Sequence, residues 1–166
     1  IATGLAFTHN VTVYDIKPEN LEQLKAKAKT GSTITTTKSL AGACNAANII
    51  AMAVPMSENA QTAHKISQYA NPGTIVFDIS SVKEPAMETI HATLPSDMLY
   101  IGTHPIMGKT GFGPLTSDPN MYRNKTVIIV PTDNPTAQPA HSTITALWEK
   151  LGATVKLMDA ASHDTL

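Results

Sequence analysis

Four places in the sequence put polar or reactive residues at the end of a short apolar run. They are Asp15, Val54-Pro55, Ser80-Ser81 and His104-Pro105. Short β-branched and apolar runs are typical of strands, and the ligands of open parallel sheets bind beyond the carboxyl ends of the strands. We therefore expect these residues to gather at one edge of a sheet and to form a site there.

His104 is the strongest candidate for proton transfer, because an imidazole gains or loses a proton near neutral pH. Pro105 restricts the backbone beside it, and Gly102 and Gly108 allow a ligand or another backbone to approach closely. The alternative is a histidine that packs in the core or caps a helix, and the residues alone leave both open.

The segment from Asp78 to Glu84 carries a hydroxyl and a carboxylate with different expected roles. Ser81 stands where a helix N-cap belongs, since Ser81 and Glu84 have the spacing of a capping box. Its hydroxyl can also face a catalytic group, and the two roles are compatible. Asp78 lies within an apolar strand, where an unpaired carboxylate is costly to bury. We expect a structural role for Asp78, with Lys83 or backbone amides as its partners.

Asp15 closes the predicted strand VTVYD. A carboxylate in this position of a dinucleotide site accepts hydrogen bonds from ribose hydroxyls and repels a 2'-phosphate, about 20 residues after a Gly-rich loop. No such loop occurs in this sequence, and by this spacing it would lie just before Ile1, with residues 1–9 as the remainder of the helix that it opens. The alternative for Asp15 is a turn residue before Pro18.

Strands and helices alternate along the chain. Expected strands cover 11–16, 33–37, 49–54, 74–79, 99–103, 127–130 and 154–158. Expected helices begin near Pro18, Ser57, Ser81 and Asn134-Pro135, and residues 106–123 form a long loop. Strands that recur about every 25 residues with helices between them indicate βαβ units. We predict an α/β fold, Rossmann-like and doubly wound, with a mostly parallel sheet and helices on both faces.

Composition excludes several classes of protein. The 166 residues carry a net charge of -1 and show no basic field that would suggest a nucleic-acid partner. The longest apolar run, Ile49 to Val54, is too short for a transmembrane helix. The single cysteine, Cys44, cannot form an internal disulfide, which favours the cytoplasm. No residue cluster has metal-ligand spacing. Most histidines outside position 104 are expected to be solvated, and His163-Asp164 stays open.

Several ordered motifs resemble one known family. Asp78-Ile-Ser-Ser-Val-Lys83 followed by Ile101-Gly-Thr-His-Pro-Ile-Met-Gly108 is similar to the D-x-x-S-V-K and G-x-H-P-x-x-G motifs of the prephenate/arogenate dehydrogenase family. Three other segments agree in order and spacing: VTVYD at 11–15, AVP at 53–55, and Leu147-Trp148 followed by Leu151-Gly-Ala, Met158 and His163-Asp164. The resemblance is to the nucleotide-binding domain and covers essentially the whole chain.

The resemblance implies NAD(P)-dependent oxidative decarboxylation of prephenate or arogenate in tyrosine biosynthesis. His104 would accept the proton of the ring hydroxyl as hydride leaves for the nicotinamide, and Ser81 would orient His104. Asp15 would bind the adenosine ribose and favour NAD over NADP. Val54, Pro55 and Ser80, which close the neighbouring strands, complete the expected cofactor site.

The same resemblance implies a domain organisation. Residues 1–160 would form a dinucleotide-binding domain that lacks its first strand and Gly-rich loop, and residues 161–166 would begin the connection to a helical substrate and dimerisation domain. We expect a homodimer in the full-length protein, no turnover by this chain alone, and a small-molecule substrate with no nucleic-acid or membrane partner. The alternatives are another hydroxy-acid dehydrogenase of the same fold and a non-catalytic nucleotide-binding module.

Overall fold

The strands form two sheets in the computed structural model, which describes residues 1–28, 31–107, 113–132 and 137–166. The smaller sheet pairs β1 (Val11–Tyr14) with β2 (Ile34–Thr37) in parallel. The larger sheet has the order β3-β4-β5-β6-β7, in which only the β5–β6 pair is antiparallel. Its strands are β3 (Ile49–Met52), β4 (Ile75–Asp78), β5 (Leu99–Ile106), β6 (Thr126–Val130) and β7 (Thr154–Leu157). The predicted mostly parallel sheet is confirmed.

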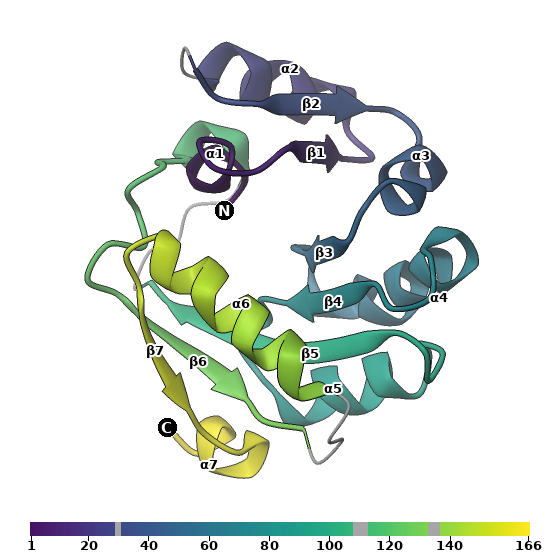
Figure 1. The fold of residues 1–166 in the computed structure, drawn as a ribbon, viewed down its shortest axis with the longest axis vertical. Coiled ribbons are helices and arrows are strands. Elements are labelled where there is room, and N and C mark those ends of the chain that lie inside the picture. Colours follow the sequence, from purple (N-terminus) through teal and green to yellow (C-terminus); the bar gives the residue numbers. More distant parts are fainter. Residues whose placement is uncertain (29–30, 108–112, 133–136) are drawn as a thin grey trace.

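Helices connect the strands and cover both faces of the larger sheet (Figure 1). They are α1 (Ala2–Leu5), α2 (Pro18–Lys27), α3 (Leu40–Asn45), α4 (Asn59–Tyr69), α5 (Glu84–His91), α6 (Gln138–Lys150) and α7 (Ala160–Asp164), with short 3-10 turns η1 (Met56–Glu58) and η2 (Pro114–Thr116). In the described ranges, none of these helices is long and apolar enough to cross a membrane.

The strands of the larger sheet alternate their side chains between two cores. Val76 of β4 and Tyr100 of β5 are paired neighbours and pack with Ile66 of α4. The next residue of β4, Phe77, points to the other face and meets Trp148 of α6 edge-on, with ring centroids 5.9 Å apart. Because both faces are buried, the strands are apolar throughout, which explains their continuous hydrophobic runs.

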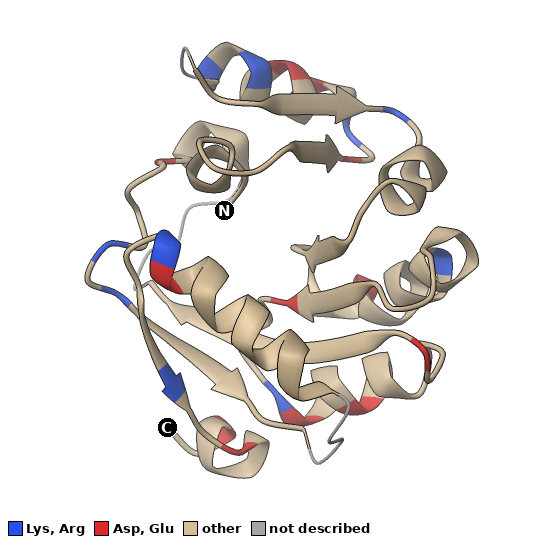
Figure 2. Ribbon diagram, viewed as in Figure 1, with Lys and Arg blue, Asp and Glu red and all other residues tan. Residues whose placement is uncertain are grey.

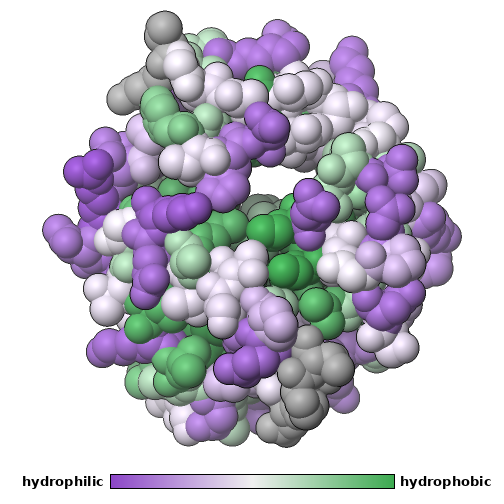
Figure 3. All heavy atoms as spheres, viewed as in Figure 1, coloured by the Kyte–Doolittle hydropathy of each residue, from purple (hydrophilic) through white to green (hydrophobic). Residues whose placement is uncertain are grey.

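The smaller sheet stands apart from the larger one. No ladder joins β1 to β3 among the described strands. Figure 3 shows an opening through the molecule between the two sheets, with hydrophobic residues along its lower border. Val11 of β1 and Ile49 of β3 are only partly buried, although both contact the main core. The two sheets therefore leave unpaired strand edges that face each other across this opening.

Strand β5 continues to Ile106, three residues past the predicted end at Thr103. Its parallel neighbour β4 stops at the pair Asp78–Gly102, whereas antiparallel β6 pairs with β5 as far as Ile106. Pro105 has no N–H to donate to a neighbouring strand. It is tolerated because no described strand pairs with β5 on the β4 side at that position. His104 thus lies inside β5, yet beyond the end of the parallel part of the sheet.

The helix expected to begin near Ser57 starts at Asn59, and Ser57 is not its N-cap. Residues Met56–Glu58 form the 3-10 turn η1, and α4 begins at Asn59. The Asn59 side chain is buried and its amide donates to the hydroxyl of Ser80, 3.1 Å away. The turn thus brings the start of α4 against the end of β4.

The predicted capping box from Ser81 to Glu84 is also wrong. Helix α5 begins at Glu84, with Lys83 in the cap position and no side-chain cap from Ser81. The backbone N–H groups of Lys83 and Glu84 instead donate to the carboxylate of Asp164, at 2.7 and 2.9 Å. Lys83 turns inward to Asp78, so the helix starts only after it.

Two expectations fall outside the described residues, namely the helix start at Asn134-Pro135 and the position of Gly108. Part of the predicted loop 106–123 does have regular structure, since Ile106 belongs to β5 and η2 covers Pro114–Thr116. Figure 2 shows that Lys, Arg, Asp and Glu lie mostly on helices and connecting segments. Asp78, a buried carboxylate within β4, is an exception to this pattern.

Candidate active site

A buried ion pair supports the edge of the sheet next to His104. The Nζ atom of Lys83 lies 2.7 Å from Oδ2 of Asp78, and both side chains are fully buried. Lys83 also donates to the carbonyl of Thr103 at 2.8 Å, and Tyr100 Oη donates to Oδ1 of Asp78 at 2.8 Å. The expected structural role of Asp78, with Lys83 as partner, is confirmed. Because Thr103 precedes His104, this network fixes the backbone that carries the imidazole.

Burial dominates the acid–base chemistry of this network. It lowers the pKa of Lys83, while the Asp78 carboxylate opposes that change. Burial likewise raises the pKa of Tyr100, and the negative charge of Asp78 raises it further. Tyr100 therefore stays a neutral donor near neutral pH.

His104 belongs to a chain of three hydrogen-bonded side chains. Its Nδ1 atom lies 2.8 Å from Nε2 of His163, whose Nδ1 atom lies 2.6 Å from Oδ1 of Asp164. The two imidazole rings meet edge-on, with centroids 5.0 Å apart. His163 is buried, whereas His104 is half-buried. Helix α7 thus brings a residue pair from the end of the chain to the side chain in β5.

The surroundings of His104 favour the neutral imidazole. Burial lowers the pKa of His104 below its usual value, and the neighbouring His163 and Lys83 act in the same direction, against the carboxylates of Asp78 and Asp164. Its Nε2 atom makes no hydrogen bond to any described residue. Such an imidazole can accept a proton at neutral pH from a group placed beside Nε2.

The residues after β3 and β4 lie at the same edge as His104, because β3, β4 and the first part of β5 are parallel. Ser80 is half-buried, accepts from Asn59 and donates its N–H to Asp78. Val54 is half-buried, and Pro55 is exposed. These residues can form one wall of a ligand site at this edge.

Ser81 is exposed, and its hydroxyl makes no hydrogen bond within the described part of the chain. The partner of the His104 Nδ1 atom is His163. The expected role of Ser81 in orienting His104 therefore stays a prediction.

Asp15 follows β1 in the smaller sheet. Its Oδ1 atom accepts from the N–H of Lys17 and its Oδ2 atom from the side-chain amide of Asn20, both at 2.8 Å. Each carboxylate oxygen has a second lone pair, so both can still accept from ribose hydroxyls. The turn thus holds the carboxylate in one orientation. A role of Asp15 in this turn is therefore compatible with a role in binding ribose.

Sequence reasoning missed His163 and Asp164 as site residues. The available signal was an adjacent imidazole and carboxylate shortly after the last strand, where a helix end can reach the same sheet edge. The expectation that His141 is solvated is wrong, because it is buried and its Nε2 atom lies 3.2 Å from the N–H of Thr132. Cys44 is buried as expected of a small apolar residue.

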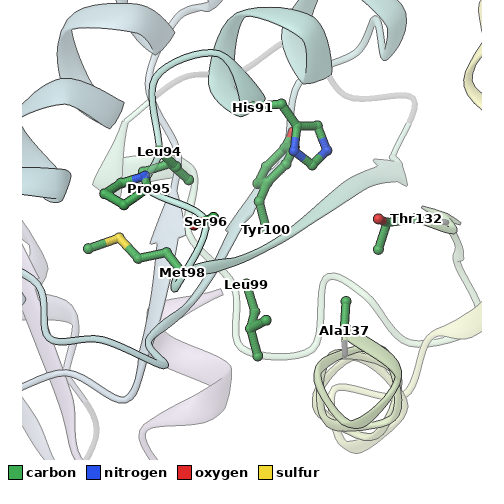
Figure 4. Close-up of a pocket in the computed structure, with 9 residues that line it drawn as sticks. All are labelled: His91, Leu94, Pro95, Ser96, Met98, Leu99, Tyr100, Thr132 and Ala137. Atoms are coloured by element: carbon green, nitrogen blue, oxygen red, sulfur yellow. The ribbon is translucent and has the colours of Figure 1, made fainter. Parts of the chain in front are cut away.

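A pocket of about 300 Å³ lies at the opposite end of β5. Leu99 and Tyr100 at the start of the strand line it together with His91 of α5, as Figure 4 shows. The edge-on contact of the His91 and Tyr100 rings, with centroids 4.9 Å apart, forms part of its wall. This pocket is distinct from the edge that carries His104. Over the described ranges, no group of three or more His, Cys, Asp or Glu residues can hold a metal ion.

The fold and the site together define a class: a Rossmann-like α/β domain with a neutral imidazole beyond the parallel strand ends. The family model "Prephenate dehydrogenase, nucleotide-binding domain" matches residues 4–157. The chain therefore belongs to this family.

Relatives agree with this assignment. The chain is 26% identical over 154 residues to the cyclohexadienyl dehydrogenase of Zymomonas mobilis, covering 93% of this chain and 51% of that protein. The chain thus spans about half the length of this curated relative.

Solved structures show the same fold. Prephenate dehydrogenase from Aquifex aeolicus, in complex with hydroxyphenyl propionate and NAD+, has a TM-score of 0.82 at 24% identity, over 98% of this chain and 56% of that one. Arogenate dehydrogenase from Synechocystis has a TM-score of 0.77 at 22% identity, over 98% and 57%. The expected fold class and family are both confirmed.

Proposed function

We propose that this chain is the nucleotide-binding part of a dehydrogenase that converts prephenate or arogenate by NAD-dependent oxidative decarboxylation, in tyrosine biosynthesis. The observation that carries the proposal is His104, a neutral imidazole with Nε2 free of described partners, held beyond the parallel strand ends. Family membership supports the reaction class.

The residues present fit a dinucleotide. The Asp15 carboxylate is held by Lys17 and Asn20 and has lone pairs left for two ribose hydroxyls. It would repel a 2'-phosphate, which favours NAD over NADP. Val54, Pro55 and Ser80 border the same edge as His104. NAD, when bound, supplies the acceptor for the hydride.

His104 performs the proton transfer in this proposal. Its Nε2 atom accepts the proton of the ring hydroxyl while hydride leaves the carbon that carries this hydroxyl. The resulting ring loses carbon dioxide and becomes aromatic, which gives 4-hydroxyphenylpyruvate from prephenate. Ser81, in the segment after β4, orients His104 in this proposal. General base catalysis of this kind contributes about 10²–10⁴ in rate.

The opening between the two sheets supports a domain proposal. One further strand preceding Ile1, followed by a Gly-rich loop, would pair with both β1 and β3 and complete a single sheet with residues 1–160. Residues 161–166 would lead into a helical domain that holds substrate and forms a homodimer. The buried free Cys44 is consistent with a cytoplasmic enzyme.

The test is turnover by the full-length protein. His104→Asn should lower kcat by about 10²-fold or more, with the Kd for NAD unchanged. His64→Asn changes an exposed histidine on α4 and serves as the control, with wild-type kcat expected. Wild-type turnover by His104→Asn would contradict the proposal. Assays with prephenate, arogenate and small hydroxy acids separate it from the other hydroxy-acid dehydrogenases, and the absence of any turnover would favour a non-catalytic module.

A further inference from the structure

The Asp164 carboxylate is an acceptor for three donors. Its Oδ1 atom receives the N–H of Lys83 at 2.7 Å and faces Nδ1 of His163 at 2.6 Å, and its Oδ2 atom receives the N–H of Glu84 at 2.9 Å. Burial opposes ionisation, but the hydrogen bonds from Lys83, His163 and Glu84 outweigh it and lower the pKa of Asp164. The ionised carboxylate has no hydrogen to donate.

This acceptor determines which nitrogen of His163 carries hydrogen. Because Asp164 can only accept, Nδ1 of His163 must be the donor in that contact. A neutral imidazole that carries hydrogen on Nδ1 has a lone pair on Nε2. As a neutral imidazole, His163 therefore accepts at Nε2 from His104.

The same reasoning then applies to His104. Its Nδ1 atom lies 2.8 Å from Nε2 of His163, so Nδ1 of His104 must carry the hydrogen of that bond. The hydrogen of a neutral imidazole occupies one nitrogen only, which leaves Nε2 of His104 with its lone pair. This is the nitrogen without a partner among the described residues.

We infer that His163 and Asp164 are positioning residues, which hold His104 in the tautomer with hydrogen on Nδ1 and so present the Nε2 lone pair to the substrate hydroxyl. The inference rests on the proposed role of His104 as proton acceptor. When His104 takes up the proton at Nε2, its Nδ1–H remains donated to His163, and the nearby Asp164 carboxylate stabilises the positive charge. No bond to either positioning residue forms or breaks in this step.

The first experiment needs no activity. Nitrogen-15 NMR of histidine-labelled protein distinguishes ring nitrogens with and without hydrogen, and the loss of signals in His104→Asn assigns those of His104. With neutral His104, we expect hydrogen on Nδ1 and none on Nε2. Hydrogen on Nε2 in the wild-type protein would overturn the inference, whatever the protein catalyses.

The second experiment compares two changes of His163 in the full-length enzyme. In His163→Gln, the side-chain carbonyl can replace the Nε2 acceptor, whereas His163→Leu fills similar space without an acceptor. We expect His163→Leu to lose the Nδ1–H tautomer and about 10²-fold in kcat, with an unchanged Kd for NAD, and His163→Gln to recover most of both.

Asp164→Asn tests the far end of the chain, with Asp159→Asn as the matched control. The carboxylates of both residues accept from backbone N–H groups at a helix start, but only the Asp164 carboxylate contacts the His163 ring, whereas Asp159 meets His163 through its backbone carbonyl alone. We expect Asp164→Asn to shift the tautomer of His104, because the amide can donate to Nδ1 of His163, and Asp159→Asn to leave it unchanged.

The outcomes separate this inference from the proposed function. If the tautomer is as expected but His104→Asn retains full turnover, the proposed function fails and the positioning role fails with it. If His104→Asn is inactive but His163→Leu and His163→Gln turn over at the wild-type rate, only the positioning role is overturned. Parallel loss of tautomer and kcat in His163→Leu, with recovery in His163→Gln, supports both.

Discussion

The ammonium group of Lys83 lies 2.7 Å from the carboxylate of Asp78, with neither side chain accessible to solvent. Truncation of one member of such a pair leaves the other charge buried and uncompensated. We predict that Lys83→Met lowers the free energy of unfolding by about 3–5 kcal/mol, as measured by urea denaturation.

The double change Asp78→Asn with Lys83→Met is the control for this interpretation, because it removes both charges. Its loss of stability should be smaller than the sum of the two single losses, since the buried uncompensated charge is absent. Additive losses would show that the two charges do not stabilise each other.

Stability should fall on acidification because His104 and His141 are harder to protonate in the native state than in the unfolded chain. Burial lowers the pKa of His104 and of His141 below the usual value of 6.5. Between the lowered native pKa and the unfolded pKa of 6.5, the unfolded chain therefore binds more protons than the native protein. The stability that these histidines contribute above pH 6.5 is lost as the pH falls from 6.5 through the native pKa. Urea denaturation at neutral pH and at about pH 5.5 measures this loss.

Single replacements identify the histidines responsible for this pH dependence. His104→Gln and His141→Gln should each reduce the loss of stability on acidification. His64→Gln, at an exposed position on α4, should keep the wild-type dependence. An unchanged slope in all three variants would mean that other groups cause the effect.

The cofactor preference should depend on Asp15. We predict that Asp15→Asn in the full-length enzyme weakens NAD binding and raises the ratio of NADP to NAD in kcat/KM, because the negative charge that repels a 2'-phosphate is gone. Asp118→Asn is a matched control, since Asp118 also accepts a backbone N–H two residues later in its turn. Equal effects of the two changes would contradict a specific role for Asp15.

Alanine substitutions at two glycines with positive φ compare the cost of backbone strain alone with the cost of strain plus a steric clash. Gly73 has φ +80° and open space around it, whereas a Cβ on Gly152, at φ +84°, would lie 2.9 Å from Cγ of Arg123. Gly73→Ala should cost about 1–2 kcal/mol from the left-handed conformation alone. Gly152→Ala should cost more, and equal losses by thermal or urea unfolding would show that Arg123 moves aside freely.

The order of the elements was predictable from the sequence because each strand is a short apolar run next to a helical pattern. Asp78 was predictable as well, since a carboxylate inside such a strand requires a partner, and Lys83 was near enough in sequence to supply it. The start of α5 was not, because its acceptor is the distant Asp164 and not the local Ser81.

The contact between His104 and His163 was beyond local sequence patterns for the same reason. The two residues are 59 positions apart and meet only after β6, α6 and β7 are in place. The extension of β5 past His104 likewise depends on its antiparallel partner β6. Contacts that depend on the path of the whole chain leave no short-range signature.

The binding of Asp164 to the first N–H groups of α5 has a mechanical consequence. One five-residue helix, α7, is attached to the start of α5 through Asp164 and to β5 through His163. A rotation of α7, by a force on the residues beyond it or by a partner that grips it, would draw the His163 ring away from β5. Movement of α7 is thus coupled to the position of the His163 ring beside His104, with the contact between Asp164 and α5 as the fixed point.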